Sequence, residues 1–226
     1  MPFSHKLELL VRVSRPTYWI GPPILYFFGM LQAGTYPQTI AEIILAAALS
    51  FPLSLVIYGV NDIYDHDTDI KNPRKGKAWA DGAVLNKAHY QYILSACKVA
   101  TTGILFLALP ASIQSSQILG LISVSLAVAW AYSSPPIRFK ERPVMDSMFS
   151  GLLYWSIWAC GFVISKESTY SGRDILTHGA WVIFNVMGLH SLAAIIDANA
   201  DAAAKVRTIA TVYGEKCTAL FIMASL

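Results

Sequence analysis

The chain has 226 residues, of which 55% are hydrophobic and only 14% are charged. Soluble domains typically carry about 25% charged residues, so the composition excludes an ordinary soluble domain and indicates a membrane protein. The net charge is only +3, and we expect no nucleic-acid partner. Cys97, Cys160 and Cys217 lie far apart in or near apolar runs, which predicts packing residues rather than disulfides or metal ligands.

The N-terminal residues 1–16 carry Lys6, Arg12 and Arg15 and have no cleavage-type signal pattern. We predict that they form an amphipathic helix leading into the membrane. About 20 apolar residues are needed to cross a bilayer. The segments that meet this need are residues 17–36, 40–61, 89–109, 116–133, 147–165 and 176–196, and a seventh apolar stretch begins near residue 213.

Prolines mark two of these segments. Pro22 and Pro23 lie near the start of the first span, where proline is tolerated, whereas Pro52 should bend the second. The seventh stretch reaches only about fourteen residues before Leu226, which is too short to cross. We therefore expect residues 1–226 to form one all-α, polytopic transmembrane bundle with six complete spans and a partial seventh, incomplete at its C-terminus.

The positive charges predict an orientation. Most of the 17 lysine and arginine residues lie in the N-terminal segment and in residues 62–88, 134–146 and 197–216, whereas the opposite loops carry only Lys166 and Arg173. Positive residues favour the cytoplasmic side. We therefore expect a multi-pass protein of the cell membrane, with the loops that follow the second, fourth and sixth spans facing the cytoplasm.

A cluster of acidic residues follows the second span, in the segment Asn61 to Asp69. On a continuous helix, Asp62, Asp65 and Asp69 fall within roughly 60° of one another, while Asp67 points the other way. Carboxylates together with substrate phosphate oxygens bind Mg²⁺. The alternative is a solvated helix end, but acidic residues are costly at a membrane edge and a second acidic pair favours a chemical role.

That second pair, Asp197 and Asp201, follows the sixth span at i and i+4 and should lie on one face of a helix. Lys205, four residues further on, should continue this stripe of residues along the same face. Two helices that end in carboxylates on the same side of the membrane can face each other across one cavity. Their carboxylates could hold Mg²⁺ ions on opposite sides of one diphosphate and neutralise the charge that builds on a leaving group.

The motifs Asn61-Asp62-x-x-Asp65-x-x-x-Asp69 and Asp197-x-x-x-Asp201 together resemble the paired acidic motifs of the UbiA superfamily of membrane prenyltransferases. The resemblance extends from Arg15-Pro16 to the stretch from Arg207 to Gly214. It implies a bundle of nine spans, of which this chain supplies six and part of a seventh. It also implies that Asp62, Asp65, Asp69, Asp197 and Asp201 bind Mg²⁺ and a prenyl diphosphate, with Asn61 assisting.

Basic residues near these motifs are candidates for diphosphate binding. The segment from Tyr132 to Lys140 resembles the family's tyrosine, proline and basic loop, in which Arg138 and Lys140 could donate to phosphate oxygens. Arg15 resembles a family position near the diphosphate, and Lys205 and Arg207 follow the second acidic pair. Each could instead be an ordinary cytoplasmic charge, and we expect Lys71, Arg74 and Lys75 to be solvated.

Two residues on the spans are candidates for contact with the reacting carbons. Tyr58 lies one turn before Asp62 and could shield an allylic cation, because aromatic faces stabilise cations. His190 lies two turns before Asp197 and could contact an acceptor or act as a base. Packing roles are the alternatives for both. Lys98 lies within the third span, where we expect its ammonium group to reach the interface rather than serve catalysis.

The resemblance implies a prenyltransferase that moves a prenyl group from an allylic prenyl diphosphate to a lipophilic acceptor with loss of pyrophosphate. The stretches Ser14 to Trp19 and Phe139 to Ser147 look most like the lycopene-elongase members. An aromatic quinone precursor remains open as the acceptor.

Two other classes of protein could place acidic residues in a membrane bundle. A non-enzymatic carrier would usually bury them near the midplane rather than at helix ends. A CDP-alcohol phosphotransferase would carry an Asp-Gly-x-x-Ala-Arg signature, which the sequence lacks.

Overall fold

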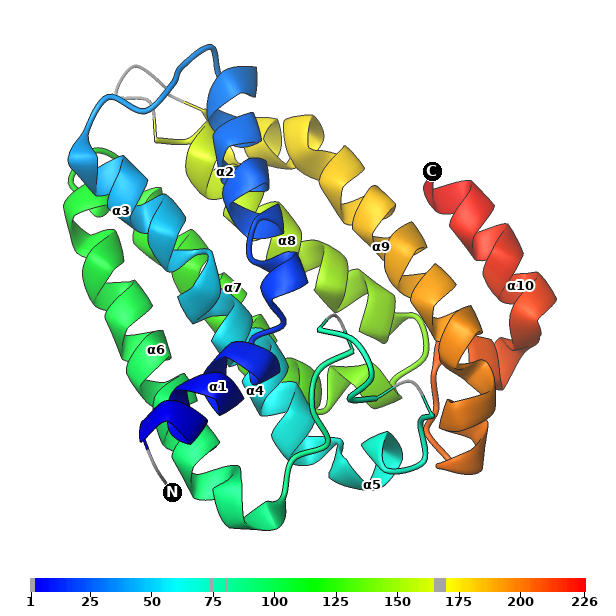
Figure 1. Ribbon diagram of the computed structural model, residues 1–226. Helices are drawn as coiled ribbons and strands as arrows, with labels where there is room; N and C mark the ends of the chain where they lie inside the picture. The colour runs from blue at the N-terminus through cyan, green and yellow to red at the C-terminus, as the bar shows by residue number, and fades with distance from the viewer. Residues whose placement is uncertain (1–2, 74, 80, 165–169) are drawn as a thin grey trace.

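The computed structural model describes residues 3–73, 75–79, 81–164 and 170–226, and within these ranges the chain is helical without strands (Figure 1). The predicted all-α class is confirmed. The α-helices are α1 (Phe3–Val13), α2 (Gly21–Gln32), α3 (Ile40–Ala48), α4 (Phe51–Tyr64), α5 (His66–Asp69), α6 (Tyr90–Ser112), α7 (Gln117–Ser133), α8 (Met145–Phe162), α9 (Gly172–Ala203) and α10 (Ile209–Ser225). Three short 3₁₀ turns cover Pro16–Tyr18, Lys87–His89 and Phe139–Glu141.

Local sequence explains where the helices begin and break. α2 and α4 each begin with proline in the first turn, where its missing N–H costs nothing. The second predicted span is divided into α3 and α4 just before Pro52, as expected from its proline. Thr39 and Glu42 form a capping box that starts α3. Gly214, at φ +81°, kinks α10.

The helices coincide with the predicted spans, but two differ clearly in length: α2 is shorter than the first span, and α9 extends beyond the predicted 176–196 at both ends. Within the described residues, three helical segments are long and apolar enough to cross a membrane: Ile40–Tyr64, Lys87–Ser112 and Gly172–Ala203. The first predicted span is shorter than expected, because α2 covers only residues 21–32 of the predicted 17–36. The chain turns at Gly34, at φ +73°, shortly after α2 ends.

α8 lies in the middle of the bundle and packs against α2, α7 and α9, while α10 packs against the outer side of α9 (Figure 1). The crossing of α2 and α8 depends on two glycines. A Cβ at Gly29 would lie 2.1 Å from the Trp158 carbonyl oxygen, and one at Gly161 would lie 1.8 Å from the Tyr26 carbonyl oxygen. Small residues of this kind let two helical backbones approach closely.

We expect Gly161→Ala to destabilise the protein, because the added methyl group meets main-chain atoms that cannot rotate away. Overpacking of this kind costs about 1–3 kcal/mol, which should appear as a lower melting temperature in detergent. The matched control is Gly103→Ala in α6, where nothing lies within 4 Å of the new Cβ. The control should melt at or slightly above the wild-type temperature. Equal effects of the two substitutions would contradict the packing argument.

The three predicted cytoplasmic loops lie together at one end of the bundle. Lys140 contacts Asp65, and the Asn72 side chain donates to Asp197 Oδ1 over 3.3 Å, so all three loops are joined. At the opposite end, Gln114 Nε2 donates to Thr39 Oγ1 over 3.0 Å. Lys166, predicted in a loop on the opposite side, and Arg74, predicted to be solvated, lie outside the described residues.

Candidate active site

A cavity of about 810 Å³ lies within the bundle. Its polar end is lined by residues from the loop end of the bundle, and its apolar part is lined by residues of α2, α8 and α9. The predicted site residues that line it are Arg15, Tyr58, Asn61, Asp65, Asp69, Tyr132, Lys140, His190, Asp197 and Asp201. The structure therefore brings both acidic motifs to one cavity.

The first acidic motif is not one continuous helix. α4 ends at Tyr64, and Asp65 adopts non-helical backbone angles before α5 begins at His66. The predicted common face still emerges, because Asp62, Asp65 and Asp69 are buried while Asp67 is exposed. The break turns Asp65 and Asp69 toward the cavity and leaves Asp62 directly behind its wall.

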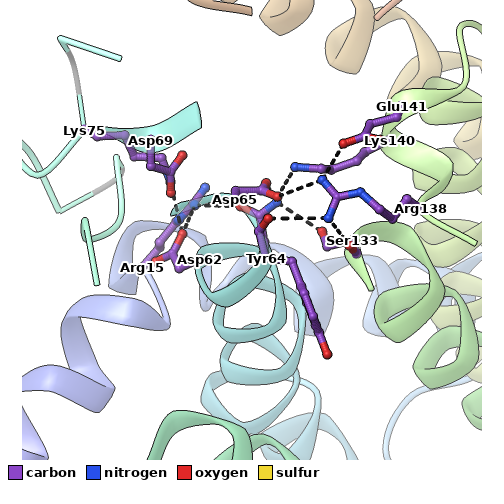
Figure 2. Close-up of polar contacts among 11 residues, drawn as sticks. Arg15, Asp62, Tyr64, Asp65, Asp69, Lys75, Ser133, Arg138, Lys140 and Glu141 are labelled. Atoms are coloured by element: carbon purple, nitrogen blue, oxygen red, sulfur yellow. Dashed lines mark hydrogen bonds and ion pairs between the residues drawn. The ribbon is translucent and has the colours of Figure 1, made fainter. Parts of the chain in front are cut away.

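Two basic residues neutralise Asp62 (Figure 2). Arg15 Nη2 and Lys75 Nζ lie 2.9 Å and 3.0 Å from Asp62 Oδ1, and Lys75 Nζ also lies 2.9 Å from Asp69 Oδ2. The expectation that Lys75 is solvated was wrong, since its side chain is only 11% exposed. The loop folds back over α4 and inserts this lysine between two carboxylates.

The same loop holds the guanidinium group of Arg15. Gly82 adopts φ +76°, and a Cβ there would lie 2.7 Å from Arg15 Nε. Only a glycine allows this approach. The next residue, Ala83, donates its backbone N–H to Asp62 Oδ2 over 3.3 Å. Arg15 is thus fixed between the loop and Asp62.

Asp65 is held from the other side of the cavity. Its carboxylate contacts Lys140 and accepts a hydrogen bond from the Asn61 side chain. Arg138 Nη2 lies 4.0 Å from Asp65 Oδ1, but this guanidinium group chiefly pairs with Glu141 and donates to the Ser133 and Tyr64 carbonyl oxygens (Figure 2). Arg138 therefore clamps the end of α4 and does not line the cavity.

The second acidic motif enters the cavity from α9, but the basic residues after it do not. α9 ends at Ala203, Lys205 adopts φ +60°, and the Val206 N–H donates to the Asp201 carbonyl oxygen over 2.9 Å. This is the hydrogen bond of a Schellman helix end. The expectation that Lys205 continues the stripe was wrong, because the reversal leaves Lys205 and Arg207 exposed and outside the cavity lining.

Burial shifts the pKa values of two residues at the polar end of the cavity. Burial, opposed by Lys75, raises the pKa of Asp69 to about 6. Burial also lowers the pKa of Lys140 to about 8. Such shifts are common where charged groups are gathered for ligand binding.

Among the residues that the structure describes, no three acidic, histidine or cysteine side chains converge on one metal position. The donor set still fits Mg²⁺ bound together with a diphosphate, because one or two carboxylates suffice when phosphate oxygens complete the shell. Two buried polar atoms in the cavity wall have unused hydrogen-bonding capacity. Asp69 Oδ2 accepts no well-aligned hydrogen bond despite its ion pair with Lys75, and Arg15 Nε donates none.

The aromatic and histidine candidates also line the cavity. Arg15 Cζ lies 4.4 Å from the centre of the Tyr58 ring, so part of this aromatic face already covers a cation. Tyr132 and His190 are hydrogen-bonded to each other over 2.9 Å. Lys98 is exposed and lies away from the cavity.

Sequence reasoning missed Asn72, Lys75 and Asp146 as lining residues. Lys75 lies in a charged loop, where its sequence context resembles that of solvated neighbours. Asp146 lies at the start of α8, after a proline-rich loop. An acidic residue at the start of an apolar span is the sequence signal by which it could have been predicted as a site residue.

A family model and several known proteins are similar to this chain. The UbiA prenyltransferase family matches residues 23–226. A lycopene elongase/hydratase from Corynebacterium glutamicum is 33% identical over 94% of this chain and 71% of its own length. Another from Halobacterium salinarum is 29% identical over 89% of this chain and 70% of its own length.

Two solved structures share the fold. A UbiA homologue from Archaeoglobus fulgidus, bound to DMAPP and Mg²⁺, superposes with a TM-score of 0.79 at 17% identity, covering 96% of this chain and 73% of that one. The apo UbiA homologue from Aeropyrum pernix K1 gives 0.70 at 22% identity, covering 93% and 74%. The resemblance expected from the acidic motifs, with its lycopene-elongase character, is confirmed. Because the family match spans residues 23–226 and relatives align along most of the chain, this protein belongs to the UbiA prenyltransferase family.

Proposed function

We propose that this protein transfers a prenyl group from an allylic prenyl diphosphate to a long, apolar acceptor of the carotenoid type. The observation that carries the proposal is the form of the cavity, whose polar end gathers acidic residues from two separate motifs and whose remainder is apolar. The names of the relatives from Corynebacterium and Halobacterium support a carotenoid acceptor.

The polar end would hold the diphosphate. We assign Asp65 and Asp69 on one side, with Asp62 behind them, and Asp197 and Asp201 on the other, as the residues that hold Mg²⁺. Bound there, Mg²⁺ would neutralise the charge that builds on the leaving pyrophosphate. Arg15, Lys75 and Lys140 would turn from carboxylate partners to donors for phosphate oxygens. Asn61 keeps the Asp65 carboxylate oriented.

The apolar part of the cavity would hold the two hydrocarbon chains. Its lining includes Ile24 and Leu25 from α2 and Val186 and Leu189 from α9. Such walls exclude water from the cation that forms when the C–O bond of the donor breaks. We also propose that residues 1–226 act as one domain, because the cavity is lined by residues of α2, α4, α5, α7, α8 and α9.

The test uses purified protein in detergent with a series of prenyl diphosphates and lycopene as acceptor. We expect pyrophosphate release together with a product whose mass increases by the prenyl unit. A carrier would release no pyrophosphate, and a phosphotransferase would need a nucleotide-linked donor. Pyrophosphate release with an aromatic quinone precursor but not with lycopene would assign the other acceptor class.

We also propose that the polar end of the cavity faces the cytoplasm, as the positive residues favour. Lys77 is exposed in the loop beside the site, and Ser116 is exposed at the opposite end. In a background without Cys97, Cys160 and Cys217, an impermeant thiol reagent added to intact cells should label Ser116→Cys and not Lys77→Cys. The reverse pattern would invert the orientation.

A further inference from the structure

A hydroxyl and an imidazole meet inside the cavity, away from the loop residues that hold the carboxylates. Tyr132 is on α7 and His190 on α9, and the Tyr132 hydroxyl lies 2.9 Å from His190 Nε2. The two rings are perpendicular, with centres 5.9 Å apart. Both side chains line the cavity, so a substrate in the cavity can reach them.

The other side of the imidazole is held in a fixed orientation. His190 Nδ1 lies 3.3 Å from Ser150 Oγ on α8. If Nδ1 carries the ring proton and donates it to Ser150, then Nε2 is free to accept the hydroxyl proton of Tyr132. The hydrogen bonds on both sides of the ring thus fit a tautomer in which Nε2 is the basic nitrogen.

The buried carboxylate of Asp146 can balance a positive charge on the His190 ring. Asp146 is 1% exposed, lines the same cavity and lies one turn before Ser150 on α8, the residue that contacts His190. The orientation of its carboxylate is fixed by the backbone N–H groups of Ser147, at 2.7 Å, and Ile209, at 3.4 Å. Burial by itself opposes a positive charge on the His190 ring, and a carboxylate near the ring offsets part of that cost when the ring takes up a proton.

The proposed reaction needs such a proton acceptor, and this inference rests on that function. When the donor C–O bond breaks, its electron pair leaves with pyrophosphate. The π electrons of an acceptor double bond then form the new C–C bond, which leaves a tertiary cation on the acceptor. The reaction ends as an alkene only when an adjacent C–H bond breaks, its electrons form a double bond and its proton leaves.

We propose that Tyr132 and His190 remove this proton. The Tyr132 oxygen takes the proton from the acceptor cation while the Tyr132 hydroxyl proton passes to His190 Nε2, and Asp146 balances the resulting imidazolium. Tyr132 is the catalytic residue, and His190 and Asp146 act through it. The pair therefore determines whether the cation ends as an alkene or is captured by water as an alcohol.

The test compares His190→Gln and Tyr132→Phe with wild type, measuring pyrophosphate release and product masses in the same reactions. Glutamine can accept the tyrosine hydrogen bond but is not basic. Pyrophosphate release in each reaction serves to normalise the product yields. The ratio of alkene product to water-captured alcohols should fall about 100-fold, which is the lower range for loss of a general base. The double variant should be no worse than either single one.

The matched control is His178→Gln, a histidine on the same helix that is exposed and bonded to the Asp174 carbonyl oxygen. It should keep the wild-type ratio. A wild-type ratio in His190→Gln or Tyr132→Phe would overturn the proposal and leave the departing pyrophosphate as the base. Equal loss of pyrophosphate and alkene would also overturn it. A wild-type protein that releases no pyrophosphate would instead refute the proposed function itself, and this role with it.

Discussion

Asp65→Asn should lower the rate of pyrophosphate release by about 1000-fold, because the side chain keeps its shape but loses the charge that faces the diphosphate. Losing one well-placed group that stabilises developing charge costs about 100- to 1000-fold. The substitution also leaves Lys140, which is 8% exposed, without its carboxylate partner. Steady-state pyrophosphate release in detergent measures the effect.

Asp67→Asn is the matched control, because it makes the same chemical change two residues away on an exposed side chain. It should retain activity within about twofold, since exposed charges contribute little. A circular dichroism spectrum and a melting curve confirm that both variants fold. Similar losses in the two variants would show that the cavity-facing position of Asp65 is not what matters.

Removal of divalent metal should abolish activity altogether. If paired carboxylates hold the diphosphate through Mg²⁺, then EDTA removes the cation through which they bind a ligand that is itself negatively charged. We expect pyrophosphate release to fall to background and to return when Mg²⁺ is added in excess. The melting temperature should change little in EDTA, because basic residues pair with the first acidic motif in the structure. Undiminished turnover after thorough chelation would contradict the metal role.

Much of the fold could be predicted from the sequence because apolar length and proline position are local signals. The break before Pro52 and the helices around the six apolar stretches follow from them. The acidic motifs were equally visible, since carboxylates are rare in an apolar chain. Both motifs line one cavity because the predicted loops do lie at one end of the bundle.

The basic side of the site could not be predicted, because it depends on how loops fold back. Lys75 and Lys205 both follow acidic motifs, yet only Lys75 reaches the carboxylates. Its loop turns through Gly76 and Gly82, both at positive φ, whereas the reversal after α9 points Lys205 to solvent. Periodicity alone carries no information on either turn. Tyr132 and His190 approach each other from different helices, which is likewise a tertiary contact.

The central claim is that both acidic motifs hold one metal-bound diphosphate. The most direct measurement uses Mn²⁺, which also prefers oxygen ligands, with a prenyl thiodiphosphate that does not ionise. Phosphorus NMR reports how strongly the bound metal broadens the two phosphorus signals. The account predicts strong broadening in wild type, and a large loss of broadening in both Asp65→Asn and Asp197→Asn at the same Mn²⁺ concentration. Wild-type broadening in Asp197→Asn would show that α9 does not help to hold the metal and would contradict the account.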